Sequence, residues 1–298
     1  MRKTKNTILL LLTALIWGSA FVAQSVGMDY VGPFTFNSVR CLIGGLVLLP
    51  CIFFFKRFGI GDGGWEEEKS VKGRRDLITG GILCGVFLAC ASSAQQVGLT
   101  YTTVGKAGFI TAMYIVIVPV LGIFLKRLPK PAVWVSVVLA VAGLYLLCMT
   151  DSFALSPGDA WVLASALLFA FHIMVIDYFS PKADGVKLSC IQFFVAGIVC
   201  GVPMLLFEKP QILEILQAWQ PILYAGVLSC GVAYTLQIIA QKDYDPTAAS
   251  LILSLESVFS VLAGWVILGE ELSPRELAGC ALMFAAIILV VTANGRSK

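Results

Sequence analysis

Four ionisable side chains within or at the edge of long apolar stretches of this sequence are candidate site residues. They are Arg40, Lys106, His172 and Glu256. A charged group deep in such a stretch costs roughly 3 kcal/mol unless it is paired, faces a wet cavity or reaches an interface. These residues therefore predict a binding or proton-transfer site, with structural ion pairing as the alternative.

Glu256 is the clearest of the four, because it lies halfway along the apolar stretch Thr247–Leu268. Its short side chain cannot reach water along a helix. We expect it to bind an ammonium group or to take up a proton, unless it is locked in a structural pair with Arg40. Arg40 lies roughly 6 Å outward of the centre of its own stretch, at the rise of an α-helix. It is suited to clamping a carboxylate, to reaching the interface or to holding a helix in place.

Lys106 begins another apolar stretch, and His172 is the only histidine of the chain. Lys106 either reaches the interface or contacts a solute, while His172 either packs or relays protons. The nine cysteines show no CxxC spacing, and neither an HExxH nor a GxSxG motif occurs. The sequence therefore predicts no catalytic residue, no metal site, no cofactor and no enzymatic activity.

Amide and aromatic side chains form a second group of candidates. Several recur at three- and four-residue spacing on one face of an expected helix. They either line a cavity that binds a polar solute or join neighbouring helices, at about 0.6 kcal/mol for each such contact. The residues are Trp17, Gln95, Gln96, Tyr114, Tyr234 and Gln237.

The composition shows where these residues must be placed. Of the 298 residues, 58% are hydrophobic and only 13% are charged, and the mean hydropathy is +0.90. Soluble domains are about 25% charged, so a soluble enzyme, a nucleic-acid-binding protein and a disordered chain are excluded. An integral membrane protein with a lipid bilayer around it remains.

Ten apolar stretches are long enough to cross a bilayer, which takes about 20 residues. Helices are expected for all of them, since the stretches do not alternate as barrel strands do. They are Ile8–Gly27, Phe34–Phe55, Leu77–Leu99, Val104–Leu125, Ala132–Met149, Asp159–Phe179, Val186–Phe207, Pro221–Ala240, Thr247–Leu268 and Glu276–Ala293.

Basic residues set the expected orientation. Counted on alternating sides from a cytoplasmic N-terminus, the cytoplasmic segments hold seventeen of the 21 lysines and arginines, and the opposite segments hold two. Cytoplasmic loops of membrane proteins carry this excess. We therefore expect a multi-pass protein of the cell (inner or plasma) membrane with both termini and the charged loop Lys56–Asp76 in the cytoplasm.

Small and hydroxyl residues predict close helix packing. Gly81 and Gly85 form a GxxxG pair, and Ser250 and Ser254 belong to a hydroxyl stripe largely opposite Glu256. Such residues let helix backbones approach one another in a bilayer. We expect both sets to face protein rather than the solute.

An internal repeat divides the chain. A shift of 143 residues aligns Tyr101 with Tyr244 and Pro131 with Pro274, with two apolar stretches in similar positions. Each half has five stretches. Because five is an odd number, the second half enters the membrane in the opposite orientation to the first. Inverted repeats build secondary transporters with a binding site near the membrane midplane.

Several short motifs are spread over essentially the whole chain: Trp17-Gly18-Ser19, Arg40, Gly105–Phe109, Val118-Pro119, Leu253–Phe259, Leu268–Leu272 and Gly279. In this order they resemble the EamA family of the drug/metabolite transporter superfamily. The resemblance implies ten transmembrane helices in two inverted five-helix repeats, residues 1–150 and 151–298. It also implies transport of small metabolites, often the export of amino acids.

The expected function is secondary transport of a small-molecule substrate by alternating access around a midplane cavity. Charges of both signs favour an amino acid or a related zwitterion, with a proton as the candidate coupling ion. No GxxxxGK[ST] motif for ATP occurs. The alternatives are a receptor or scaffold that does not transport, and a transporter of a neutral or lipophilic drug-like solute. No nucleic-acid partner is expected.

Overall fold

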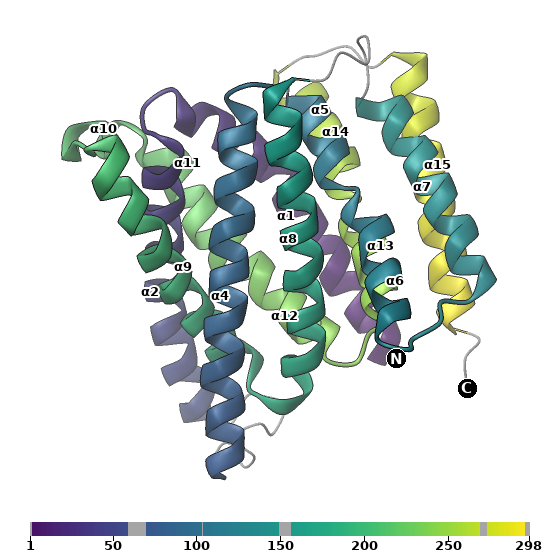
Figure 1. Cartoon of the computed structure of the whole chain (residues 1–298), viewed down its shortest axis with the longest axis horizontal. Coiled ribbons are helices and arrows are strands. Elements are labelled where there is room, and N and C mark those ends of the chain that lie inside the picture. Colours follow the sequence, from purple (N-terminus) through teal and green to yellow (C-terminus); the bar gives the residue numbers. More distant parts are fainter. Residues whose placement is uncertain (1, 59–69, 103, 149–155, 269–272, 296–298) are drawn as a thin grey trace.

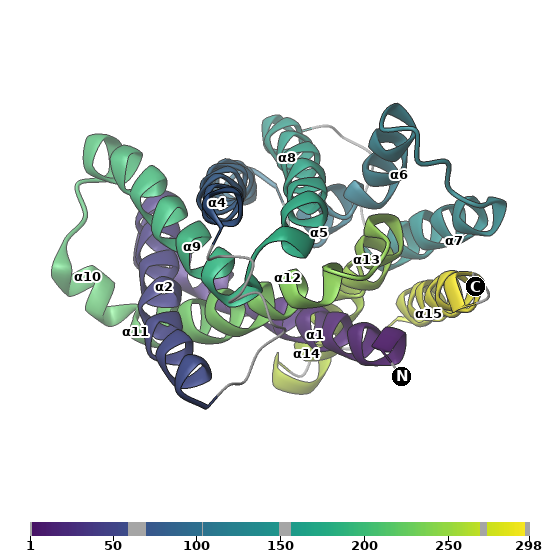
Figure 2. The ribbon, with the colours of Figure 1, turned by 90° about the horizontal axis from the view of Figure 1, so that it is seen from below.

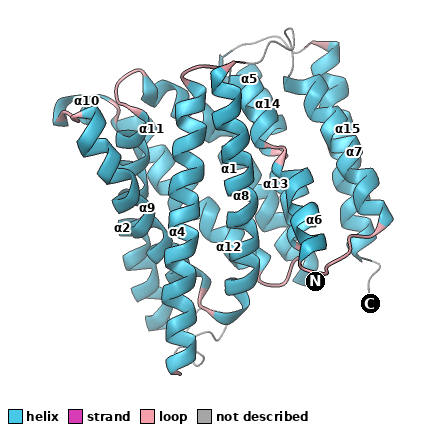
Figure 3. Ribbon diagram, in the orientation of Figure 1, coloured by secondary structure: helices cyan, strands magenta, loops and turns pink. Residues whose placement is uncertain are grey.

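The computed structural model describes residues 2–58, 70–102, 104–148, 156–268 and 273–295, and these ranges are helical without strands (Figures 1 and 3). Nine of the described helices are long and apolar enough to cross a membrane, and Pro131–Leu147 is a shorter apolar helix. The ten predicted spans are thus present as an all-helical membrane bundle.

The α-helices have the following bounds: α1 Arg2–Met28, α2 Pro33–Phe58, α4 Val71–Leu99, α5 Val104–Thr111, α6 Tyr114–Phe124, α7 Pro131–Cys148, α8 Pro157–Phe179, α9 Gly185–Pro203, α10 Ile212–Gln217, α11 Trp219–Leu223, α12 Thr235–Gln241, α13 Pro246–Leu253, α14 Glu256–Leu268 and α15 Pro274–Gly295. Three further helical segments connect them: the 3-10 turn η1 Ser180–Lys182 and the π-helical stretches η2 Met204–Glu208 and η3 Tyr224–Tyr234.

Several helix boundaries differ from the sequence-based expectation, and α1 begins at Arg2 rather than Ile8. α4 begins at Val71 rather than Leu77, because the Ser70 hydroxyl caps it by accepting a hydrogen bond from the Gly73 amide at 2.9 Å. Part of the expected loop Lys56–Asp76 is therefore helical, while residues 59–69 lie outside the described ranges. The short helix α10 was not predicted, since six residues carry too little periodicity.

Two spans are interrupted near their middle. One break separates α5 from α6 at residues 112–113, and the other separates α13 from α14 at residues 254–255. The 143-residue shift of the repeat places the two breaks within one residue of each other. The broken spans run in opposite directions in Figure 1, where α5 lies above α6 but α14 lies above α13. This is the antiparallel relation that an inverted repeat produces.

The broken spans differ in how much lipid they can meet. In the α13–α14 span 72% of the apolar window Pro246–Ala263 is buried inside the protein, against 50% for the α5–α6 window. By contrast, α7 and α15 form a pair at one side of the bundle (Figure 2), and only 33% of the apolar window Pro274–Ala293 of α15 is buried. The α13–α14 span is therefore the most protein-enclosed of the described spans.

Glycine allows two pairs of helices to approach closely. A methyl group at Gly85 in α4 would lie 2.7 Å from the Gln192 carbonyl oxygen of α9, and one at Gly279 in α15 would lie 2.7 Å from the Gly143 carbonyl oxygen of α7. The predicted packing role of the GxxxG pair is confirmed, because Gly81 also packs against α9, at Ile191.

The outer surface of the bundle is apolar. Phe53, Val138, Ile198 and Ile288 on four different helices are each more than 60% exposed, as are many other large aliphatic and aromatic side chains. Soluble monomers do not expose contiguous apolar surface of this extent. Lipid chains must cover it, so the polar groups described below lie inside the bundle rather than on its surface.

Candidate solute-binding site

A cavity lies within the bundle, and most of its residues come from the middle of their spans. The volume available to the centre of a water molecule is about 50 Å³, enough for a few waters. Helices from both halves of the chain line it. The residues are Trp17, Ala20, Phe21, Gln24, Arg40, Gln95, Thr111, Tyr114, Phe169, His172, Ile173, Ser229, Tyr234, Gln237, Leu253 and Glu256.

The two helix breaks meet at this central cavity. Glu256 is the first residue of α14 and Tyr114 is the first residue of α6, and the Tyr114 hydroxyl donates a hydrogen bond to Glu256 Oε1 at 3.2 Å. Both side chains are buried. The N-terminus of a helix carries a partial positive charge, which stabilises a carboxylate at this position. The breaks thus place an acid and its hydroxyl partner from opposite halves of the chain inside the cavity.

Arg40 enters the same cavity from α2. Its side chain is 3% exposed, and Nη1 lies 3.4 Å from the Gln24 amide oxygen. Nε has no hydrogen-bond partner among the described residues. Within that part of the chain no carboxylate pairs with Arg40, so the alternative of a direct structural lock to Glu256 is not what the structure has. A buried guanidinium with a free donor is equipped to bind an anionic group.

Close helix contacts hold these two residues in place. A methyl group at Gly18 of α1 would lie 2.7 Å from the Glu256 carbonyl oxygen and 2.8 Å from the Ser260 amide nitrogen. Similarly, one at Gly226 of η3 would lie 3.1 Å from the Arg40 carbonyl oxygen. Gly18 of the Trp17-Gly18-Ser19 motif therefore lets α1 pack closely against the start of α14. In the same way, Gly226 lets η3 pack against the turn of α2 that carries Arg40.

Tyr234 is the centre of an aromatic cluster that forms one wall. Its ring centroid lies 4.5 Å from that of Trp17, 5.7 Å from that of Phe193 and 6.0 Å from that of His172. The indole Nε1 of Trp17 has no partner among the described residues. A buried indole usually finds an acceptor, so this donor remains available to a solute.

The remaining polar residues are partly committed to protein contacts. Gln95 Nε2 donates to Thr111 Oγ1 at 3.1 Å, and His172 Nε2 lies 2.8 Å from Gln192 Oε1. His172 is therefore held by an amide rather than by a carboxylate. Gln237 is 1% exposed, and its Oε1 has no partner within the described ranges. Gln237 offers the cavity an acceptor that the protein does not use.

Eight of the ten residues selected from the sequence line this one cavity. Gln96 does not: it is fully buried outside the lining, and neither of its amide atoms has a partner among the described residues. It is adjacent to Gln95, so a helix turns it about 100° away. Lys106 belongs to α5, but its side chain lies outside the part of the chain that the structure describes.

Some lining residues were not predicted, among them Gln24, Thr111 and Ser229. Gln24 follows Trp17 by seven residues on α1, a spacing that was open to detection as one helical face. Ser229 lies in the π-helical stretch η3, where the α-helical spacing does not apply. Thr111 carries no pattern of its own and is placed by the break between α5 and α6.

The comparisons with known proteins agree with this architecture. A crystal structure of a protein superposes with a TM-score of 0.80 at 17% identity over 98% of both chains, which supports the fold alone. A protein of Archaeoglobus fulgidus that is named an uncharacterized transporter is 31% identical, covering 94% of this chain and 84% of that one. The threonine/homoserine exporter RhtA of Escherichia coli is 26% identical, covering 94% and 88% of the two chains.

The model of the EamA-like transporter family matches twice, over residues 4–149 and 156–292. The two matches cover nearly the whole chain, with a central gap of six residues. The expected resemblance is confirmed: the chain is a multi-span membrane transporter and belongs to the EamA-like transporter family, within the drug/metabolite transporter superfamily.

Proposed function

We propose that the protein is a secondary transporter of an amino acid or a closely related zwitterion. The observation that carries this proposal is that the buried side chains of Arg40 and Glu256 line one cavity without a direct ion pair between them. A zwitterion supplies a carboxylate for the guanidinium and an ammonium group for the acid. The name of the relative RhtA, a threonine/homoserine exporter, supports the same class.

The polar lining divides into roles in this proposal. Arg40, with Gln24 beside it, binds the carboxylate, and Glu256 binds the ammonium group or takes up a coupling proton. Gln237 and Trp17 supply an unused acceptor and an unused donor for a polar side chain. The aromatic wall around Tyr234 limits the size of that side chain.

Transport proceeds by alternating access between two repeats, residues 1–150 and 151–298. The two family matches and the paired helix breaks support this division. A cavity of about 50 Å³ is too small for an amino acid, so the site must widen when the solute binds. The broken spans, which meet at Tyr114 and Glu256, are the segments best placed to change shape when solute binds.

The orientation follows from the distribution of basic residues. The face that carries both termini in Figure 1 is cytoplasmic in this proposal, the membrane is the cell membrane, and net movement is export. A cysteine introduced at Lys242 should react with a membrane-impermeant maleimide only after intact cells are opened. Labelling of that cysteine from outside would reverse the orientation.

Flux into proteoliposomes tests the function. Labelled L-threonine and L-homoserine should accumulate in vesicles that contain the protein, and the unlabelled amino acid should compete. The methyl ester and the N-acetyl derivative should each compete poorly, because each removes one charge. Equal competition by both derivatives favours the neutral-solute alternative, and binding without flux favours a receptor.

The exposed cation Lys72 on the termini face supplies a matched control. Lys72→Gln removes one positive charge outside both the cavity lining and the bundle interior. Its flux should equal that of the wild type, whereas Arg40→Gln should lose flux while remaining folded. Equal flux in both variants would remove Arg40 from the site.

A further inference from the structure

A second and larger cavity opens at the termini face of the bundle. Its volume available to water centres is about 560 Å³, roughly ten times that of the central cavity. The start of α1, the α6–α7 connection, the α12–α13 connection and α15 surround it. The residues are Thr4, Thr7, Ile8, Gly122, Arg127, Leu128, Pro129, Lys130, Val133, Asp243, Tyr244, Asp245, Pro246, Thr247 and Val291.

The lining of this termini-side cavity carries charges of both signs. Arg127 and Lys130 contribute the cations, and Asp243 and Asp245 contribute the carboxylates. The α6–α7 connection holds both cations, and the α12–α13 connection holds both acids. Charges of opposite sign on two different connections suit a zwitterion, the solute class assigned above to the central cavity.

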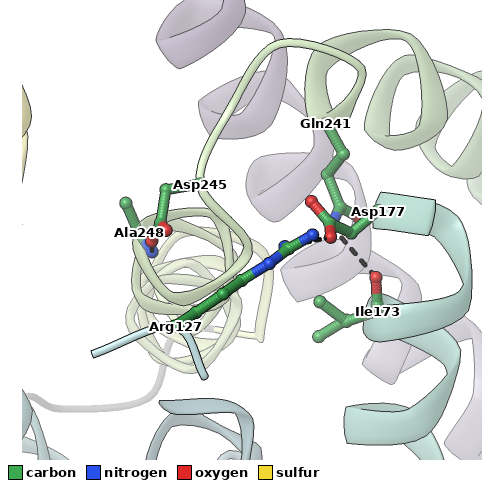
Figure 4. A network of polar contacts seen from close by, with 6 residues as sticks. All are labelled: Arg127, Ile173, Asp177, Gln241, Asp245 and Ala248. Carbon is green, nitrogen blue, oxygen red and sulfur yellow. Dashed lines mark hydrogen bonds and ion pairs between the residues drawn. The ribbon is translucent and has the colours of Figure 1, made fainter. Parts of the chain in front are cut away.

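An ion pair lies between the two cavities. Arg127, which lines the termini-side cavity, pairs with Asp177 of α8, as Figure 4 shows. Asp177 lies one helical turn beyond Ile173, which lines the central cavity. The Ile173 carbonyl oxygen also accepts from Gln241 Nε2 at 3.4 Å. Arg127 thus links a connection of the first half of the chain to the helix that leads to the central site.

The exposure of the Arg127–Asp177 pair allows Arg127 to exchange its partner. The Arg127 side chain is 53% exposed, whereas that of Asp177 is 13% exposed. Exposed ion pairs are weak because water competes for both charges and long side chains lose freedom. A solute carboxylate that accepts two parallel hydrogen bonds from the guanidinium is a stronger partner than a single exposed contact.

We propose that the termini-side cavity is a vestibular binding site for the transported amino acid, at which Arg127 exchanges the Asp177 carboxylate for that of the solute. This inference rests on the proposed function. The exchange breaks the link between the α6–α7 connection and α8 as the solute arrives. Solute binding at the surface therefore opens the way to the central cavity.

Protection from alkylation tests the vestibular site. Leu128, which lines the cavity and is 80% exposed, is replaced by cysteine in a chain whose own cysteines are changed to alanine. L-Threonine should slow the reaction of Leu128→Cys with a maleimide. Adding Arg127→Gln should raise the half-protecting concentration about tenfold, the loss of roughly 1.4 kcal/mol of binding.

Two further variants separate binding from mere loss of the ion pair. Asp177→Asn also breaks the pair but frees Arg127, so the half-protecting concentration should fall. Glu256→Gln disables the central site and should leave protection intact. The same weakening in Arg127→Gln and Asp177→Asn, or loss of protection in Glu256→Gln, would overturn the proposal.

The outcomes also distinguish this inference from the proposed function. Flux of L-threonine without protection of Leu128→Cys contradicts the vestibular site alone. Absence of both flux and protection contradicts the amino-acid assignment and the vestibular site together. Protection that persists without flux supports the vestibular site and argues for a receptor.

Discussion

The two broken spans carry the same backbone feature and different chemistry. Each is interrupted near its middle, at positions that the repeat relates within one residue. The α5–α6 break presents the hydroxyl of Tyr114, whereas the α13–α14 break presents the carboxylate of Glu256. The repeat thus supplies two equivalent helix breaks, and the residues that follow the two breaks differ in chemistry. One half supplies a charge, and the other supplies the group that orients it.

The largest expected effect comes from the charged side of this comparison. Glu256→Gln keeps the volume and removes the charge, so flux should fall by at least about 100-fold, or roughly 2.7 kcal/mol. The variant should still insert and purify as a folded protein, and any dependence of flux on pH should disappear. Wild-type transport at every pH would make Glu256 a structural residue.

The close packing of Gly18 against α14, at the α13–α14 break, should affect the stability of the protein. Alanine normally favours a helix over glycine by about 0.5–1 kcal/mol. At Gly18, however, the added methyl would lie 2.7 Å from a backbone oxygen of α14, and overpacking of this kind costs about 1–3 kcal/mol. Gly18→Ala should therefore lower the thermal midpoint in detergent.

The first spans of the two halves align at a shift of 152 residues, with Ala14–Trp17 resembling Ala166–Phe169. This alignment makes Ala170 the position that matches Gly18 in the other half. It is fully buried on α8, which packs against α5 and α6. Ala170→Gly should cost only the helix preference of about 1 kcal/mol. A larger loss of stability in Ala170→Gly than in Gly18→Ala would mean that the α5–α6 break is the more tightly packed of the two.

The hydroxyl side of the comparison should show a smaller effect on transport. Tyr114→Phe keeps the ring and removes one hydrogen bond to a charged group, worth about 1.5–3 kcal/mol when fully formed. At 3.2 Å the bond is long, so we expect flux to fall about tenfold. A loss as large as that of Glu256→Gln would give the two breaks equal roles.

The smallest effect concerns the contact that anchors the first break. Gln95 donates to Thr111, the last residue of α5. A double-mutant cycle with Gln95→Leu and Thr111→Val should give a coupling of about 0.6 kcal/mol in unfolding, the usual value between membrane helices. A coupling near zero would mean that the contact between Gln95 and Thr111 does not anchor this break to α4.

The sequence predicted the spans, the packing glycines and half of the residues that line the central cavity. Each of these depends on local hydropathy or on polar residues that a bilayer makes conspicuous. The breaks were not predicted, since Ala112-Met113 and Ser254-Leu255 contain neither glycine nor proline. The Ser254 hydroxyl bonds to its own helix at the Leu251 carbonyl, a local competition that composition does not reveal.

Long-range contacts were equally outside the reach of the sequence. Arg127 looked like one of many basic loop residues, and Asp177 like the polar end of a span. Their pairing depends on how the α6–α7 connection folds back over α8. Likewise, Gln96 shares residue type with Gln95, and only the helix rotation distinguishes the cavity-lining side chain from the enclosed one.

The deep enclosure of the α13–α14 span has a consequence for how the chain is made. Lipid meets little of this span, and it carries a buried acid, so its own transfer from the translocon into lipid is less favourable than that of its neighbours. It needs helices already present to receive it: α1, which is synthesised first, and α7, which ends the first half. A fragment expressed without residues 2–148 should therefore leave this span poorly inserted, and co-expression of the missing half should restore it.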